Sequence, residues 1–236
     1  MSNTIKYNVD QDGIALLTFD LPGKSMNVLT PGLMQELDEL VKKAAADDAV
    51  KGLVLTSGKA AFIAGADIKD MVTAYDRGIT PREAYEFSYD LNRTLRNMET
   101  CGKPVAAAIN GLSLGGGLEV CQACHYRVLA DHPKAVLGIP EVKIGLLPRA
   151  GGTPRTPRLI GFRNAAMMVL QCRNQRPQQA LEMGLVHEVA PVDIVVERAR
   201  RWVLEEGDRI APWDKKGFKL QYGGLMRPGT AQTFMA

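Results

Sequence analysis

The sequence predicts an α/β protein with a largely parallel sheet, followed by a helical layer. In the first part of the chain, short apolar runs typical of buried strands alternate with amphipathic helical segments. Glycine, proline and polar turn residues separate these runs. From Gly151 onward the pattern is mostly helical. Alternating β and α units of this kind favour helices packed on a mostly parallel sheet.

The chain opens with a β-β-α-β pattern. Alternating apolar residues at Ile5 to Val9 and Ile14 to Phe19 flank the turn dipeptide Asp12-Gly13, which indicates a β-hairpin. Thr30-Pro31 is typical of a helix start, with threonine as the cap and proline at the first helical position. Gly52 to Thr56 is a buried-strand run. The helix between them places on one face Leu33, Leu37, Leu40, Val41 and Ala44.

The middle of the chain predicts two helices and a strand. The loop from Ser57 to Ala66 leads into a short helix that begins near Asp67. Thr80 and Glu83 have the spacing of a capping box, so a longer helix starts there and ends near Gly102. Pro104 to Ile109 is the next buried strand. The longer helix is predicted to direct inward Tyr85, Leu91, Leu95 and Met98.

Further strands are predicted at Tyr126 to Ala130, Ala135 to Gly138 and Leu185 to Ala190, with helix breaks at Gly161, Pro177 and Gly184. A last helix spans Pro191 to Glu206, with Ile194, Val195, Trp202 and Val203 inward, and Gly207 closes it. We therefore expect one domain over residues 1–206 and an irregular segment over 207–236.

Composition restricts the classes of function. The chain has 236 residues, 46% hydrophobic and 23% charged, as in soluble globular proteins. The net charge of +3 and the lack of a basic block give little support to nucleic-acid binding, but suit a substrate that carries phosphates. We find neither a secretory leader nor an apolar run long enough to span a membrane, so we expect a cytoplasmic protein.

The segment Cys121-Gln-Ala-Cys124-His125 matches the pattern of covalent haem attachment. That chemistry normally accompanies export, and the same residues continue the apolar helical pattern of Leu118 and Val120. We therefore favour a packed helix. No second ligand pair has zinc spacing, so no metal site is expected. His125, His132 and His187 form no triad pattern and are expected to be structural or surface residues.

A glycine-rich turn from Asn110 to Gly117 joins the strand that ends at Ile109 to a helix. Backbone amides in such a turn can hold a developing negative charge, although a tight helix–sheet crossing also needs small residues. Glu119 follows one turn into the helix between apolar neighbours, and burial there would raise its proton affinity. Glu141 follows Pro140 in another apolar stretch. The two glutamates are either an acid–base pair or unrelated.

Three segments resemble the signatures of the crotonase (enoyl-CoA hydratase/isomerase) family, in family order and spacing. They are Phe62 to Ile68, Asn110 to Glu119 and Pro140 to Pro148, and Arg149-Ala-Gly-Gly-Thr extends the third. The similarity covers roughly residues 5–206 and is greatest to the N-terminal hydratase module of multifunctional fatty-acid oxidation enzymes. It implies a crotonase-like spiral of ββα units with a helical C-terminal layer.

The resemblance also implies a site. The N–H groups of Ala64 and Gly116 would hold the thioester oxygen of an acyl-CoA, while Glu119 and Glu141 would flank a water molecule and add it across the 2,3-double bond. No metal or redox cofactor would be required. Relatives suggest a homotrimer or hexamer, or a covalent continuation into a dehydrogenase domain. The substrate would be bound by Met26, Ala64, Gly65, Ala66, Asp67, Gly115 and Gly116.

Two departures from the family pattern matter for activity. Arg149 stands where most relatives carry glycine, and could obstruct the acyl tunnel or pair with Glu141 and lower its pKa. Pro154 starts Pro-Arg-Thr where relatives carry Gln-Arg-Leu, and is tolerable in a first helical turn. Two alternatives to hydration therefore stay open: an enoyl-CoA isomerase on the same site, and a catalytically silent acyl-CoA-binding module.

Overall fold

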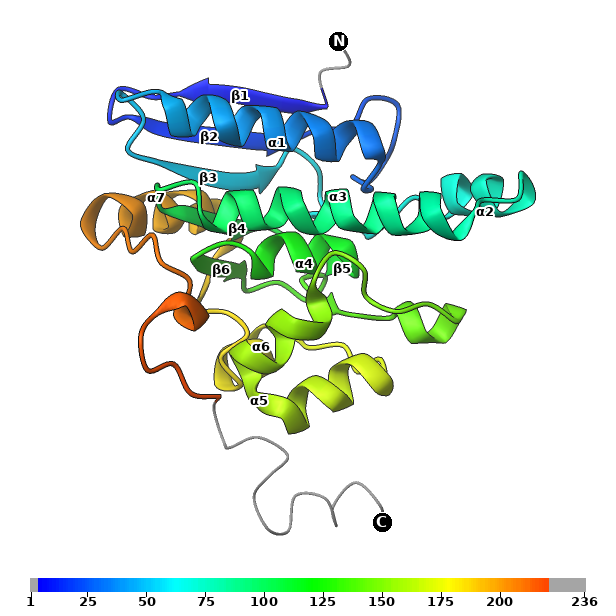
Figure 1. Ribbon diagram of the computed structural model, residues 1–236. Helices are drawn as coiled ribbons and strands as arrows, with labels where there is room; N and C mark the ends of the chain where they lie inside the picture. The colour runs from blue at the N-terminus through cyan, green and yellow to red at the C-terminus, as the bar shows by residue number, and fades with distance from the viewer. Residues whose placement is uncertain (1–3, 221–236) are drawn as a thin grey trace.

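The computed structural model describes residues 4–220, and its centre is a six-stranded mixed sheet (Figure 1). The strand order is β1-β2-β3-β4-β6-β8. The first pair is antiparallel, as the predicted hairpin requires, and every later pairing is parallel. The strands are β1 Ile5–Val9, β2 Ile14–Phe19, β3 Gly52–Ser57, β4 Val105–Ile109, β6 Tyr126–Ala130 and β8 Glu188–Ala190.

A second, smaller sheet carries the segments that follow the large strands. Its two strands, β5 Ser113–Leu114 and β7 Leu137–Gly138, pair in parallel. Isolated bridges extend this arrangement on both sides, joining Leu29 to Ala66, Ile63 to Ser113, and Leu137 to Gln175. Each successive crossover therefore adds one strand to the large sheet and one short segment to the small one. This repetition is the spiral of ββα units that the family resemblance implied.

Helices cover the sheet and form a layer at the end of the chain. In Figure 1, α1 and α3 run across the front of the sheet and α7 lies behind it, packed on β3, β4 and β6. The α5 and α6 helices lie below the sheet in the same view. The helices are α1 Pro31–Ala46, α2 Ile68–Asp76, α3 Pro81–Glu99, α4 Gly116–Gln122, α5 Gly152–Leu170, α6 Pro177–Glu182 and α7 Val195–Glu205, with 3₁₀ turns η1 Glu141–Ile144, η2 Val192–Ile194 and η3 Pro212–Asp214.

The helix starts are where their caps predicted them. Thr30 accepts a hydrogen bond from the N–H of Leu33 at the start of α1. Thr80 and Glu83 form the full capping box of α3, with each side chain accepting from the other residue's backbone N–H. These local hydrogen bonds satisfy amides that have no partner inside the helix, so they fix the boundary independently of the rest of the fold.

Two predicted inward side chains are in fact exposed. Tyr85 is 64% exposed, because α2 and the start of α3 extend beyond the edge of the sheet, and its ring stacks on Tyr89 instead (Figure 1). Ile194 is 39% exposed, because it belongs to the 3₁₀ turn η2 and α7 begins only at Val195. The other predicted inward positions of these helices, among them Leu95 and Trp202, are buried.

Several strands are shorter than predicted, since turns occupy their first residues. Ala135 donates its N–H to the carbonyl of His132, which leaves only Leu137–Gly138 in β7. Leu185 donates to Ala180 and closes α6, so β8 starts at Glu188. Within α5, Gly161 has non-helical backbone angles, in agreement with the predicted break.

The cysteine segment is part of the core, as the packed-helix interpretation expected. Cys121 and Cys124 are buried, and their thiols donate to carbonyls one helical turn earlier. His125 is also buried, and its Nδ1 accepts the N–H of Val105 at 3.0 Å. The boundary predicted at residue 206 stays a prediction. Of the predicted irregular segment, residues 221–236 lie outside the described part of the chain.

Candidate active site

A cavity of about 280 Å³ opens where the small sheet meets α2, α3 and the loop before α5. Its wall is largely apolar, and the two glutamates singled out in the sequence both reach it. Apolar pockets with a few convergent polar groups are the usual form of a small-molecule site. The residues that line it include Ala64, Gly65, Ala66, Phe87, Leu91, Gly115, Gly116, Glu119, Glu141, Lys143, Arg149 and Ala150.

The glycine turn brings backbone and carboxylate together. Gly115 caps α4 with φ +52° and ψ −127°, a conformation that side chains disfavour. A Cβ at this position would lie 2.5 Å from Oε1 of Glu141, so the Glu141 carboxylate packs directly against the turn. A Cβ at position 117 would likewise lie only 2.3 Å from the backbone oxygen of Ile63. The small residues thus serve both the crossing and the site, which the sequence had left as alternatives.

Glu119 lies on the first turn of α4 and is only 2% exposed. Its Oε1 accepts the N–H of Gly152 at 2.6 Å. Burial raises the pKa of Glu119 to about 7, the negative charge of Glu141 adds to this rise, and the amides of Gly152 and Ala150 oppose it. A carboxyl group with this pKa exchanges protons readily near neutral pH.

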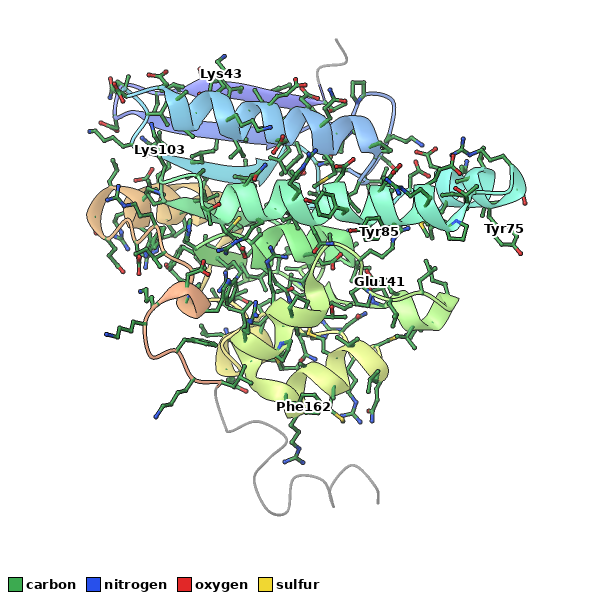
Figure 2. The ribbon with its side chains drawn as sticks, in the orientation of Figure 1. Lys43, Tyr75, Tyr85, Lys103, Glu141 and Phe162 are labelled. Carbon is green, nitrogen blue, oxygen red and sulfur yellow. The ribbon has the colours of Figure 1, made fainter. Side chains whose placement is uncertain are left out.

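Glu141 is the first residue of η1, and Figure 2 shows it between the central helices and the outer loop. Burial also raises the pKa of Glu141, while the positive charge of Arg149 lowers it by a smaller amount. Its Oε2 is buried without a hydrogen-bond partner among residues 4–220. The unused oxygen is therefore available to a ligand or a water molecule inside the cavity.

One predicted backbone role is wrong. The N–H of Ala64 donates to the carbonyl of Asn27 at 2.8 Å, so it is not free to hold a substrate oxygen. The N–H of Ala66 has no hydrogen-bond partner in the described structure, because the bridge to Leu29 uses the neighbouring amide and carbonyl groups. Gly116, at the first position of α4, lies on the same cavity wall. Within the described part of the chain, the amides of Ala66 and Gly116 are thus both free of hydrogen-bond partners beside this cavity, whereas the amide of Ala64 is not.

The remaining predicted binding residues divide into two groups. Gly65, Ala66 and Gly115 line the cavity together with Ala64. Met26 and Asp67 do not line it: Met26 is 44% exposed, and Asp67 caps α2 and forms an ion pair with Lys24 at 3.1 Å. A CoA role for these two residues stays a prediction.

The two departures from the family pattern have clear structural outcomes. Arg149 lines the cavity, where its guanidinium lies 5.2 Å from the centre of the Phe87 ring. Among the described residues it forms no ion pair with Glu141. The positive charge of Arg149 does lower the pKa of Glu141, as expected, but burial outweighs this effect and the net change is upward. Pro154 occupies the first turn of α5, where its missing N–H costs no helical hydrogen bond.

Sequence reasoning missed the residues that position the site. Asn27 is fully buried, and its side chain contacts the backbone of Leu21, Phe19 and Phe62, which fixes the loop that carries Ala66. A lone asparagine between Met26 and Val28 gave no signal for this role. Gly152 was quoted only as an extension of the third signature, although its amide holds Glu119.

Residues 10–210 match the family described as enoyl-CoA hydratase/isomerase. The chain belongs to this family. The fatty acid oxidation complex subunit alpha of Shewanella frigidimarina is 44% identical over 200 residues, which are 84% of this chain and 28% of that protein. The corresponding subunit of Shewanella sp. strain MR-4 is 43% identical over 222 residues, 94% of this chain and 31% of that protein. The chain thus spans less than a third of these relatives.

Solved structures of similar proteins support the fold. The enoyl-CoA hydratase of Bacillus anthracis superposes with a TM-score of 0.77 at 30% identity, covering 85% of this chain and 75% of that one. DspI of Pseudomonas aeruginosa has the same TM-score at 28% identity, covering 85% and 73%. Over the described residues, no helix has the length and apolarity to cross a bilayer, and no cluster of metal-ligating side chains is found.

Proposed function

We propose that the chain is an enoyl-CoA hydratase that adds water to 2-enoyl-CoA thioesters in fatty-acid β-oxidation. One observation carries the proposal: Glu119 and Glu141 reach the same apolar cavity, and burial raises the pKa of both carboxyl groups. Family membership and the similarity to fatty acid oxidation subunits support it.

The proposed reaction needs one water molecule and two carboxyl groups. A water molecule between Glu119 and Glu141 loses a proton to one carboxylate as its oxygen forms a bond to C3. The electron pair of the double bond moves toward the thioester, and Glu141 supplies the proton that C2 gains. Because the charge of Glu141 raises the pKa of Glu119, the protonation states of the two carboxyl groups are treated as a property of the pair.

Two backbone amides are proposed to stabilise the enolate. The N–H groups of Ala66 and Gly116 would donate to the thioester oxygen, and their interaction strengthens as negative charge develops there. Among the described residues, the amide of Ala66 has no hydrogen-bond partner, whereas the amide of Ala64 donates to the carbonyl of Asn27. Loss of one such donor typically costs about 3 kcal/mol of transition-state stabilisation.

The cofactor requirement, the assembly and the cellular location of the protein are also proposals. We propose that neither a metal nor a redox cofactor takes part, since water and carboxyl groups supply every proton transferred. Turnover that survives dialysis against a chelator would agree with this. A trimeric or hexameric assembly, a continuation into a dehydrogenase domain and a cytoplasmic location remain predictions, which sedimentation, the sequence of the intact gene product and cell fractionation would test.

The deciding experiment is turnover of short and long 2-enoyl-CoA thioesters by the purified chain. Hydration removes the ultraviolet absorbance of the conjugated enoyl thioester, and product analysis should show a 3-hydroxyacyl-CoA. Conversion of a 3-enoyl-CoA into a 2-enoyl-CoA without hydration would instead establish the isomerase. Protection against thermal unfolding by acyl-CoA, with no turnover of either substrate, would establish the silent binding module.

A further inference from the structure

The cavity wall carries a cation that neither donates nor accepts a proton in the proposed hydration. Arg149 lines the cavity with its guanidinium against the face of Phe87, and Leu91 continues the same wall. Among the described residues, no carboxylate forms an ion pair with it. Its side chain is half-buried, while its backbone carbonyl is fixed by the side-chain amide of Asn92. The guanidinium is thus held at the cavity wall and keeps its hydrogen-bond donors free.

Contact with an alkyl chain is unfavourable for the Arg149 guanidinium. When a methyl-ended acyl chain fills the cavity, it removes water from the guanidinium and offers no acceptor in return, which is unfavourable for a charged donor. A carboxylate accepts two parallel hydrogen bonds from the planar fork of arginine and balances its charge. The chemistry of the wall therefore favours an acyl group that carries an anionic oxygen pair.

Arg149 lies where the acyl part of the substrate would bind, so its preference for an anionic group would apply to the acyl chain. The Ala66 and Gly116 amides would bind the thioester oxygen on C1, and the carboxyl groups of Glu119 and Glu141 would transfer protons and water at C2 and C3. Phe87, Leu91 and Arg149 line the cavity on α3 and on the loop before α5, where the acyl chain would continue beyond C3. Phe87 would pack on the methylene groups while Arg149 meets the end of the chain.

We propose that Arg149 selects 2-enoyl-CoA thioesters whose acyl chain ends in a carboxylate over those that end in a methyl group. This inference rests on the proposed hydration and names the substrate class of that same site. Arg149 is a specificity-determining residue in this account. Its positive charge also lowers the pKa of Glu141, but it carries no transferred proton, so that effect acts on both kinds of substrate alike.

The test compares two 2-enoyl-CoA substrates with equal numbers of carbons, one ending in a carboxylate and one in a methyl group. The wild-type chain should hydrate the carboxylate-ended substrate with a kcat/KM at least about tenfold higher, as a charge-assisted hydrogen bond would give. Arg149→Met, which keeps length and removes charge, should reverse the order: kcat/KM falls for the carboxylate-ended substrate and rises for the methyl-ended one. A folding defect would lower both values.

Lys143 offers the matched control, because it is a second cation on the same wall but lies exposed on η1. Lys143→Met should leave the ratio of the two kcat/KM values unchanged. Equal rates for the two substrates, or a preference that follows Lys143 instead of Arg149, would overturn the inference while leaving hydration intact. Absence of hydration with both substrates and with the unsubstituted four-carbon enoyl-CoA would overturn the proposed function itself.

Discussion

The backbone N–H of Gly152 and the carboxylate of Glu119 form a hydrogen bond of 2.6 Å that joins the first residue of α5 to the first turn of α4. A Cβ at position 152 would lie 2.9 Å from the same oxygen, closer than real Cβ contacts allow. The absence of a side chain at Gly152 is therefore a condition for the position of Glu119.

Gly152→Ala should lower kcat at least about tenfold, because a displacement of a catalytic group by a fraction of an ångström is enough to disturb proton transfer. Steady-state hydration kinetics would measure this. Gly32→Ala is the matched control in the first turn of α1, where a Cβ meets no atom within 4 Å. Equal kcat values for the two variants would show that the Gly152 contact is unimportant.

Glu141→Gln should lower turnover by at least about a hundredfold, since the amide cannot donate or accept the transferred proton. The fold should persist, because only one side of the Glu141 carboxylate touches the Gly115 turn and its Oε2 has no described partner. Circular dichroism would verify this. Glu182→Gln, an exposed change on α6, should keep full turnover. Wild-type-like turnover by Glu141→Gln would defeat the assignment.

The raised pKa of Glu119 should make stability fall as pH rises. The folded protein keeps a proton on Glu119 up to about pH 7, whereas the unfolded chain releases it near the ordinary value of 4.5. The stabilising contribution is fully present below the unfolded pKa and is lost as pH rises through about 7. Its upper size is about 3 kcal/mol.

Glu119→Gln removes this titration and keeps an oxygen for the Gly152 amide. Urea unfolding at about pH 5 and about pH 8 should therefore show the variant gaining stability relative to wild type at the higher pH. A constant difference between the two proteins across this range would contradict the raised pKa. Glu83→Gln, on the exposed start of α3, provides a comparison without a buried carboxyl group.

Arg155 and Glu99 form a buried ion pair at 2.6 Å, with side chains 7% and 2% exposed. Arg155 also donates to the carbonyl of Ala150, beside the amides that hold Glu119. Arg155→Met alone should destabilise the protein by about 3 to 5 kcal/mol, because Glu99 is left buried with only Arg96 as a partner. Adding Glu99→Gln should recover part of that loss in thermal unfolding, whereas additive losses would show that the pair is not coupled.

Local signals allowed prediction of much of the fold. The Thr30 and Thr80 caps and the Asp12-Gly13 turn depend on a few neighbouring residues, and each is found where the sequence placed it. Tyr85 shows where this reasoning ends. Its helical periodicity is correct, but the start of α3 extends beyond the edge of the sheet. Periodicity carries no information about how far a helix extends beyond the sheet that it covers.

The site was predictable in its side chains and less so in its backbone. Glu119 and Glu141 could be singled out because a carboxylate in an apolar segment is unusual. The partner of each backbone amide, however, depends on which loops meet in space. Ala64 pairs with Asn27, and Gly152 pairs with Glu119, across segments that are far apart in the chain. No local sequence pattern predicts either hydrogen bond.

The geometry of the site depends on the large sheet through the small one. The pairings of the small sheet are one or two residues long and are too short to fix their own register. The register is therefore set by the six strands of the large sheet, to which these segments are connected. A substitution deep in β3 or β4 that shifts one strand slightly would move the Ala66 and Gly116 amides relative to each other. Residues that never contact the acyl group thus determine the relative position of the two amides that would bind its thioester oxygen.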